Sequence, residues 1–240
     1  MSAATARPRI AILAALPREV APLVRHWAAT PLKPKDGLNG PPSDDKGMRL
    51  WENEHAIVAC AGMGRARVAL ALELAEARGP LRSVISVGYA GALREKMRID
   101  GVYWPSIVID GQTGERFACE DGEGVLVTAD HVVGRDEKPK LATQWNADLV
   151  DMEAATVARL AKLRALPFRT VRAISDPVDD NLPDLSRFTN VRGGFQGASF
   201  AMYVALHPWL IPTTIRLGKQ SSRASQAIAA ALLQILRQAE

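Results

Sequence analysis

Two apolar segments of the chain end in acids, and these acids are well placed for chemistry. Residues 149–155 read Leu-Val-Asp-Met-Glu-Ala-Ala, and residues 171–176 read Val-Arg-Ala-Ile-Ser-Asp. Each pattern predicts a buried strand that brings a carboxylate to the edge of a sheet, where open α/β sheets bind their ligands. A carboxylate there is costly unless it meets a partner or a ligand. Glu153 and Asp176 are therefore candidate residues of a site for a polar ligand.

A third acid, Glu19, follows the first predicted strand of the chain. Residues 9–16 form a continuous apolar run, which is typical of a buried strand, and Pro17 ends it. The apolar side chains at 20, 23, 24 and 27 then share one helical face. Glu19 should therefore lie at a strand-to-helix junction, close to the helix N-terminus. Its plainest structural interpretation is that a carboxylate there interacts favourably with the helix dipole.

The remaining pattern predicts the elements that must position these acids. Alternating strands and helices favour one α/β domain over residues 1–240, with a mostly parallel sheet. Residues 31–47, rich in Pro and Gly, should form a surface loop. Gly62-Met63-Gly64 should turn a strand into a helix that ends near Gly79. Further strands are expected at 48–52, 55–61, 84–87, 102–110, 125–128, 147–151 and 168–174, a glycine-rich loop at 88–91, a polar loop at 176–192, and helices at 154–163, 195–206 and 223–236.

Composition excludes several classes of protein. The chain has 240 residues, of which 48% are hydrophobic and 23% charged, with a formal charge of +4. This mixed balance does not favour nucleic-acid binding, and no stretch approaches the roughly 20 apolar residues of a membrane span. The two cysteines form no C-x-x-C motif, and the first eight residues lack the apolar core of a secretory signal. We expect a cytoplasmic protein.

Several common functional motifs are absent. Gly62-Met63-Gly64 begins like a dinucleotide-binding fingerprint, but Arg67 occupies the position of the third glycine. The four histidines have no metal-ligand spacing, and no G-x-S-x-G nucleophile motif occurs. These absences argue against a nicotinamide dehydrogenase, a zinc enzyme and a serine hydrolase.

Four segments, taken in order, resemble the family-1 nucleoside phosphorylase and nucleosidase superfamily. They look closest to its methylthioadenosine/S-adenosylhomocysteine nucleosidase branch. The segments are Ile-Ala-Ile-Leu-Ala-Ala-Leu-Pro-Arg-Glu-Val at 10–20, Gly-Met-Gly at 62–64, Val-Gly-Tyr-Ala-Gly-Ala-Leu at 87–93, and the pair Asp-Met-Glu-Ala at 151–154 with Arg-Ala-Ile-Ser-Asp at 172–176. Each motif is weak alone, whereas the ordered set is much more specific.

The resemblance implies an α/β/α sandwich of three layers around a mixed, mostly parallel, partly barrel-like sheet. It implies cleavage of the N-glycosidic bond of a small-molecule purine nucleoside, without a metal or organic cofactor, in a homo-oligomer. By matched position Glu19 would activate water, and Asp176, supported by Ser175, would protonate the leaving base. The substrate-binding positions implied are Gly88 and Tyr89 of the glycine-rich loop, Met152 and Glu153 against the ribose, and Val132 and Val133 against the base.

The chemistry agrees with these roles. Glycosidic cleavage passes through a cationic, oxocarbenium-like sugar, which Glu153 can stabilise while it binds the sugar hydroxyls. A purine leaves poorly as an anion, so a proton donor at its N7 is needed, and burial of Asp176 would favour the protonated form. Glu19 must instead stay ionised to act as a base.

Departures from the family pattern leave three functions open. Tyr89 stands where such nucleosidases carry a small hydroxyl residue, and Ser86 stands where phosphorylases often carry an arginine. Phosphorolysis, with inorganic phosphate as co-substrate, would need a cation from elsewhere, such as Arg18, Arg65 or Arg67. The alternatives are therefore a hydrolase, a phosphorylase, and an inactive nucleoside-binding protein. Arg172 has a structural interpretation, namely pairing with a buried carboxylate, and Asp176 before Pro177 has another, as a turn residue.

Overall fold

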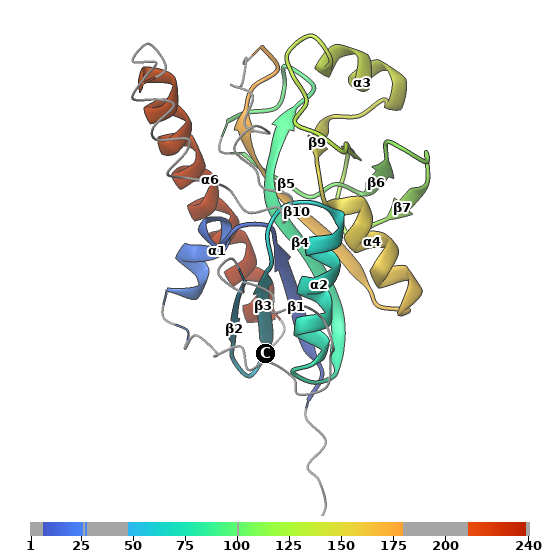
Figure 1. The fold of residues 1–240 in the computed structure, drawn as a ribbon, viewed down its shortest axis with the longest axis vertical. Helices are drawn as coiled ribbons and strands as arrows, with labels where there is room; N and C mark the ends of the chain where they lie inside the picture. Colours follow the sequence, from blue (N-terminus) through green and yellow to red (C-terminus); the bar gives the residue numbers. More distant parts are fainter. Residues whose placement is uncertain (1–6, 26, 28–47, 100, 180–210, 239–240) are drawn as a thin grey trace, which may run out of the picture.

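The computed structural model describes residues 7–25, 27, 48–99, 101–179 and 211–238. The predicted loop at 31–47, the helix at 195–206 and most of the polar loop at 176–192 lie outside this part of the chain. Within the described residues, ten strands and five helices form an α/β fold (Figure 1). No described helix has the length and apolar character needed to cross a membrane.

The ten strands form one mixed sheet. Five of the nine strand pairings are parallel, and the strands run in the order β2-β3-β1-β4-β9-β8-β6-β7 without closing into a barrel. The sheet branches at β4, which also pairs with β10, and β10 pairs in turn with β5. The strands are β1 (Arg9–Ala14), β2 (Arg49–Glu52), β3 (Ala56–Cys60), β4 (Leu81–Ala92), β5 (Val102–Tyr103), β6 (Ile107–Asp110), β7 (Arg116–Ala118), β8 (Val125–Thr128), β9 (Leu149–Asp151) and β10 (Phe168–Asp176).

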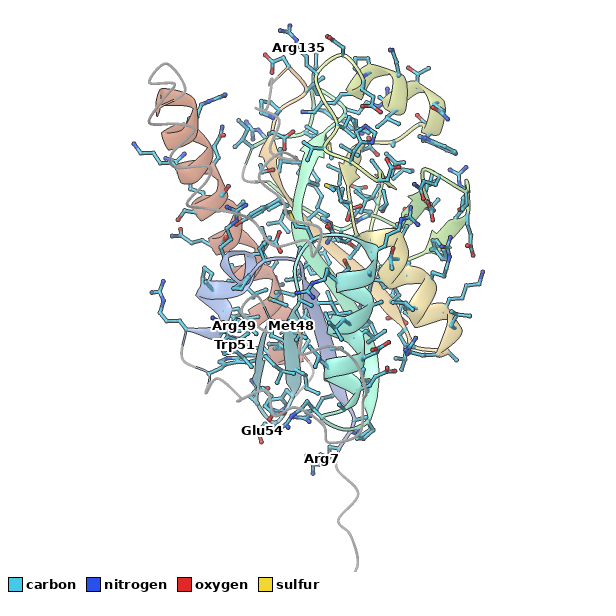
Figure 2. The ribbon with its side chains drawn as sticks, viewed as in Figure 1. Arg7, Met48, Arg49, Trp51, Glu54 and Arg135 are labelled. Carbon is cyan, nitrogen blue, oxygen red and sulfur yellow. The ribbon has the colours of Figure 1, made fainter. Side chains whose placement is uncertain are left out.

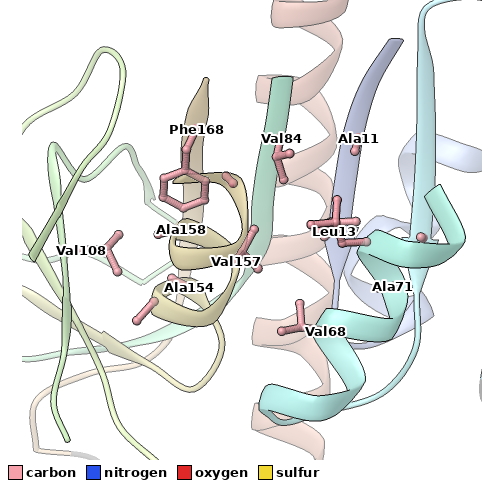
Figure 3. Close-up of a cluster of buried hydrophobic side chains, with 14 of the residues drawn as sticks. Ala11, Leu13, Val68, Ala71, Val84, Val108, Ala154, Val157, Ala158 and Phe168 are labelled. Atoms are coloured by element: carbon pink, nitrogen blue, oxygen red, sulfur yellow. The ribbon is translucent and has the colours of Figure 1, made fainter. Parts of the chain in front are cut away.

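Helices cover both faces of this sheet, which confirms the three-layer architecture. The helices are α1 (Pro17–Val24), α2 (Arg65–Glu76), α3 (Lys138–Trp145), α4 (Ala154–Leu163) and α6 (Ile211–Gln238). Because side chains alternate along a strand, Ala11 and Leu13 of β1 belong to the buried cluster on the face that α2 and α4 cover (Figure 3). Ile10 and Ile12 pack on the other face with α1 and α6.

Some predicted boundaries are wrong, and the strand pairings explain why. The glycine-rich segment 88–91, predicted as a loop, continues β4 as a strand. Neighbouring strands supply the backbone hydrogen bonds of this segment. β10 pairs with β4 as far as Gly91, and β9 pairs with Gly91 and Ala92, the last two residues of β4. The predicted strand at 102–110 is broken around Pro105, which has no backbone N–H for the ladder. β10 includes Asp176, and β7 was not predicted.

The pairings also determine where the acids meet. Asp176 at the end of β10 lies beside Gly91 of β4, and Val150 of β9 pairs with the same glycine from the other side. β9 runs antiparallel to β4, whereas β1 and β10 run parallel to it. Glu153 therefore approaches from the opposite direction to Glu19 and Asp176, and not along a parallel strand as the sequence pattern suggested. Figure 2 shows the side chains on this fold, with Arg135 at the end of the molecule where α3 lies and Arg7 and Glu54 at the opposite end.

Candidate functional site

One cavity brings together side chains from remote parts of the chain. Its volume is about 160 Å³. Its wall is formed mainly by β4 and β10, the junction between β1 and α1, the loop after β8 and the junction between β9 and α4. Eight of the nine predicted site residues line it: Glu19, Tyr89, Val132, Val133, Met152, Glu153, Ser175 and Asp176. A larger hollow, of about 550 Å³, lies between β5 and the end of α6 and contains none of them.

Gly88 is the one predicted site residue that does not line the cavity, but it lies against the side chain of Glu19. A Cβ atom at Gly88 would be 3.4 Å from the Glu19 Oε1 atom. The described residues contain no group of three or more His, Cys, Asp or Glu side chains placed to hold a metal ion.

Glu19 is both a helix-capping residue and a wall residue of the cavity. Its Oε2 atom accepts a hydrogen bond of 2.9 Å from the Leu16 N–H, just before α1 begins. Only 5% of the residue is exposed, and this burial raises the pKa of its carboxyl. The Leu16 bond and the nearby charges of Arg18 and Arg172 act in the opposite direction. Glu19 therefore keeps its structural role at the helix start while its carboxylate reaches the cavity.

Glu153 is held by the glycine turn after β3. Its Oε1 atom accepts a 3.0 Å hydrogen bond from the Gly64 N–H. Gly64 has a φ of 93°, a conformation that residues other than glycine rarely adopt, so the turn that aims this N–H requires glycine. Burial and the nearby charge of Asp151 raise the pKa of Glu153 to about 7. Its proton therefore titrates near neutral pH.

Asp151 and Arg172 form a buried ion pair next to the acids of the cavity. Asp151 accepts hydrogen bonds of 2.6 and 3.1 Å from Arg172 and one of 2.7 Å from the Thr128 hydroxyl. Arg172, 1% exposed, also donates to the carbonyls of Ser86 and Val171 and to the Ser86 hydroxyl. These contacts use all five N–H donors of the guanidinium. The structural interpretation of Arg172 is confirmed, and Ser86 serves as its partner.

Asp176 has a partner that sequence reasoning missed. Its Oδ2 atom lies 2.7 Å from the Lys138 Nζ atom, and its Oδ1 atom accepts a 2.8 Å hydrogen bond from the Ser175 hydroxyl. Lys138 is the first residue of α3 and is fully buried, and its Nζ atom also donates to the Pro177 carbonyl. In the run Asp-Glu-Lys-Pro-Lys at 136–140, no sequence signal separates this lysine from the exposed Lys140.

Because Gly91 has no side chain, the Asp176 carboxylate can lie against its backbone. A Cβ atom at Gly91 would come within 2.8 Å of Asp176 Oδ2 and 3.2 Å of a Val150 methyl group. We therefore expect Gly91→Ala to lower the free energy of unfolding by about 1–3 kcal/mol, the usual cost of overpacking. Urea unfolding measures this change. Gly134→Ala is the matched control, because a Cβ atom there has nothing within 4 Å. Equal stability of the two variants would mean that the space around Asp176 adapts freely.

Tyr89 and two basic side chains complete the described wall. The Tyr89 hydroxyl forms a 2.7 Å hydrogen bond with the Ser225 hydroxyl of α6, and Arg18 stacks over its ring at 5.7 Å. His131 is bonded by Asp130 at 2.6 Å and Glu137 at 2.9 Å, and these bonds raise its pKa. Of the other cations suggested by the sequence, Arg65 pairs with Asp110 at 2.9 Å, and Arg67 does not line the cavity.

Comparisons with known proteins agree on the family and the fold. Residues 9–121 and 118–197 match the family described as the phosphorylase superfamily. No curated protein matches the chain. Among solved structures, the 5′-methylthioadenosine nucleosidase of Arabidopsis thaliana is 18% identical, with a TM-score of 0.68 over 96% of this chain and 97% of that one.

Two structures from Helicobacter pylori are also similar. A mutant of its methylthioadenosine/S-adenosylhomocysteine nucleosidase, solved with 5′-methylthioadenosine in the active site, is 16% identical, with a TM-score of 0.63 over 95% of this chain and 99% of that one. A mutant of its futalosine hydrolase is 19% identical, with a TM-score of 0.58 over 75% of this chain and 93% of that one. At these identities the likeness establishes a shared fold.

Proposed function

Because the chain belongs to the phosphorylase superfamily, we propose that it cleaves the N-glycosidic bond of a purine nucleoside, or of a related adenosyl thioether, by attack of water. The observation that carries this proposal is the convergence of Glu19, Glu153 and Asp176 on one cavity. In the reaction the bond between C1′ and N9 breaks and its electron pair stays with the base. The water oxygen bonds to C1′ while Glu19 takes a proton from the water, and N7 of the base gains a proton from Asp176.

The contacts of Glu153 suit the binding of a sugar that becomes cationic. The Gly64 N–H fixes its Oε1 atom, and we assign its Oε2 atom to the ribose hydroxyls. A negative charge held there stabilises the oxocarbenium-like transition state more than the neutral substrate, which is the condition for faster chemistry. Met152, which also lines the cavity, would pack against the sugar, and Val132 and Val133 would line the base.

The cations near the cavity favour water over phosphate as the nucleophile. Arg172 lies beneath the glycine-rich segment, but all five of its N–H donors are engaged within the protein. Of the described wall residues, only Arg18 and His131 are basic, and His131 is already bonded to two carboxylates. A phosphate dianion in the cavity would therefore have few cationic partners, and an uncompensated buried charge is costly.

The test is to incubate the purified protein with adenosine, inosine and methylthioadenosine, with phosphate present or rigorously removed. Our proposal predicts release of free base and free sugar in both conditions. Strict dependence on phosphate, with a sugar 1-phosphate as product, would instead establish a phosphorylase. Tight binding of adenine without turnover of any substrate would establish the nucleoside-binding alternative, for which the size of Tyr89 is the main argument.

The pH dependence of the reaction should report the titration of Glu153. Because the ionised form is needed to stabilise the cationic sugar, kcat/KM should rise as pH increases through about 7, the pKa of Glu153 in the free protein. Glu153→Gln should lower kcat/KM and remove this limb of the profile. A limb near pH 7 that persists unchanged in Glu153→Gln would assign it to another group.

The same titration has a consequence for stability. In the unfolded chain, Glu153 loses its proton near the ordinary glutamate pKa of 4.5, whereas the folded protein retains it up to about pH 7. Between these values the folded state binds more protons, so the free energy of unfolding should fall as pH rises through this window. Glu153→Gln should reduce that fall.

A further inference from the structure

Lys138 occupies an unusual place for a lysine. It is fully buried, whereas lysine side chains almost never are unless they are paired. It is also the first residue of α3, where the helix dipole opposes a positive charge. Its ammonium group lies 2.7 Å from Asp176 Oδ2 and donates also to the Pro177 carbonyl. The charge of Lys138 is thus held directly against the acid that we assign to the leaving base.

This ion pair changes the chemistry available to Asp176. Both oxygens of Asp176 accept hydrogen bonds, Oδ2 from the Lys138 ammonium and Oδ1 from the Ser175 hydroxyl, so the carboxylate in this arrangement has no proton of its own to give. The Ser175 hydroxyl also donates to Asp176, but an alcohol is far too weak an acid to supply the proton. His131 lines the same cavity, yet its two ring nitrogens are bonded to Asp130 and Glu137. Of the described groups, the ammonium of Lys138 is the proton source in direct contact with Asp176.

We infer that Lys138 supplies, through Asp176, the proton that the departing purine takes at N7. The inference rests on the proposed function and adds a residue to it. An Nζ–H bond of Lys138 breaks as an Oδ2–H bond forms on Asp176, and the resulting carboxylic acid transfers a proton to N7 as the C1′–N9 electron pair moves onto the base. Lys138 is then a neutral amine that still donates to the Pro177 carbonyl. It regains a proton from solvent after the products leave, while Glu19 releases to solvent the proton it took from water.

Lys138 is therefore a positioning and proton-supplying residue, which acts through Asp176 without touching the substrate. A purely structural ion pair would also hold the carboxylate in place, so the two roles need an experiment that separates them. Any contribution to protonating the base matters more when the base is a poorer leaving group, whereas a contact that only stabilises the fold matters equally for both bases. Proton supply is then separated from holding the carboxylate in place by Lys138→Arg, which keeps the charge but retains its proton.

The test compares Lys138→Met with Lys140→Met, the same substitution at an exposed position of the same helix. Each variant is assayed on adenosine and on 6-chloropurine riboside, whose base leaves more readily as an anion. We expect Lys138→Met to lower kcat on adenosine by about 10²–10⁴-fold. Its loss on the chloropurine riboside should be smaller by about tenfold or more. Lys140→Met should behave as the wild type on both substrates.

Equal losses on the two substrates would overturn the inference and leave Lys138 a structural partner of Asp176. Full activity of Lys138→Met would overturn it as well. Lys138→Arg provides a second check, because arginine retains the positive charge but does not give up its proton. It should fail on adenosine although it still pairs with Asp176, and recovery of wild-type turnover in this variant would contradict proton supply. If the wild type itself cleaves no purine nucleoside, the proposed function fails, which is a different result from any of these.

Discussion

Asp176→Asn is expected to lower kcat on purine nucleosides by about 10²–10⁴-fold, the usual contribution of a general acid, while KM changes little. Asparagine has nearly the same shape as aspartate. Its single carbonyl oxygen can still accept from Lys138, and its amide group then takes the place of Oδ1 beside the Ser175 hydroxyl, which can accept from it. It cannot carry a proton to N7 of the base. The substitution therefore removes an interaction made in the transition state and spares ground-state binding.

Steady-state kinetics measure this split between kcat and KM. The control is Asp179→Asn, the same change three residues later at an exposed position. An Asp176→Asn protein that turns over as fast as the wild type would remove Asp176 from the mechanism. A large increase in KM with unchanged kcat would make it a binding residue only.

Glu19→Gln should abolish most of the hydrolysis, again by about 10²–10⁴-fold. The glutamine side chain can still accept the hydrogen bond from the Leu16 N–H, so the start of α1 should be retained. It cannot take a proton from the attacking water. The measurement is the rate of base release in phosphate-free buffer, with the exposed Glu95→Gln as control.

Adding phosphate to Glu19→Gln separates the two possible nucleophiles. A hydrolase gains nothing from phosphate, because the missing base still has to activate water. If phosphate restores turnover to the wild-type rate and the product is a sugar 1-phosphate, the attacking group is phosphate and our choice of water is wrong.

The sequence alone predicts much of this architecture and most of the cavity wall. Ile10, Ala11, Ile12 and Leu13 are all apolar, which predicts a strand that is buried on both faces. In the structure helices cover both faces of β1. Ordered motifs around Glu19, Glu153 and Asp176 indicate residues that share a cavity in the fold. Their catalytic roles remain predictions.

Other features depend on contacts that single-sequence patterns do not encode. The Gly88–Gly91 segment is a strand because β9 and β10 pair with it, although glycine by itself disfavours strands. Lys138 lies 38 residues from Asp176 in the chain, and only the position of α3 brings its ammonium group to the carboxylate. A buried lysine and a solvated one look alike in sequence when both lie in a short polar run.

The most direct test of the central claim is a crystal structure of Asp176→Asn soaked with methylthioadenosine. The slow variant should hold the intact substrate. Our account predicts the ribose hydroxyls on the carboxylate of Glu153, N7 of the base facing residue 176, and Glu19 on the side of C1′ opposite the base. A nucleoside bound elsewhere on the protein, or one bound in this cavity with its glycosidic bond remote from all three residues, would contradict it.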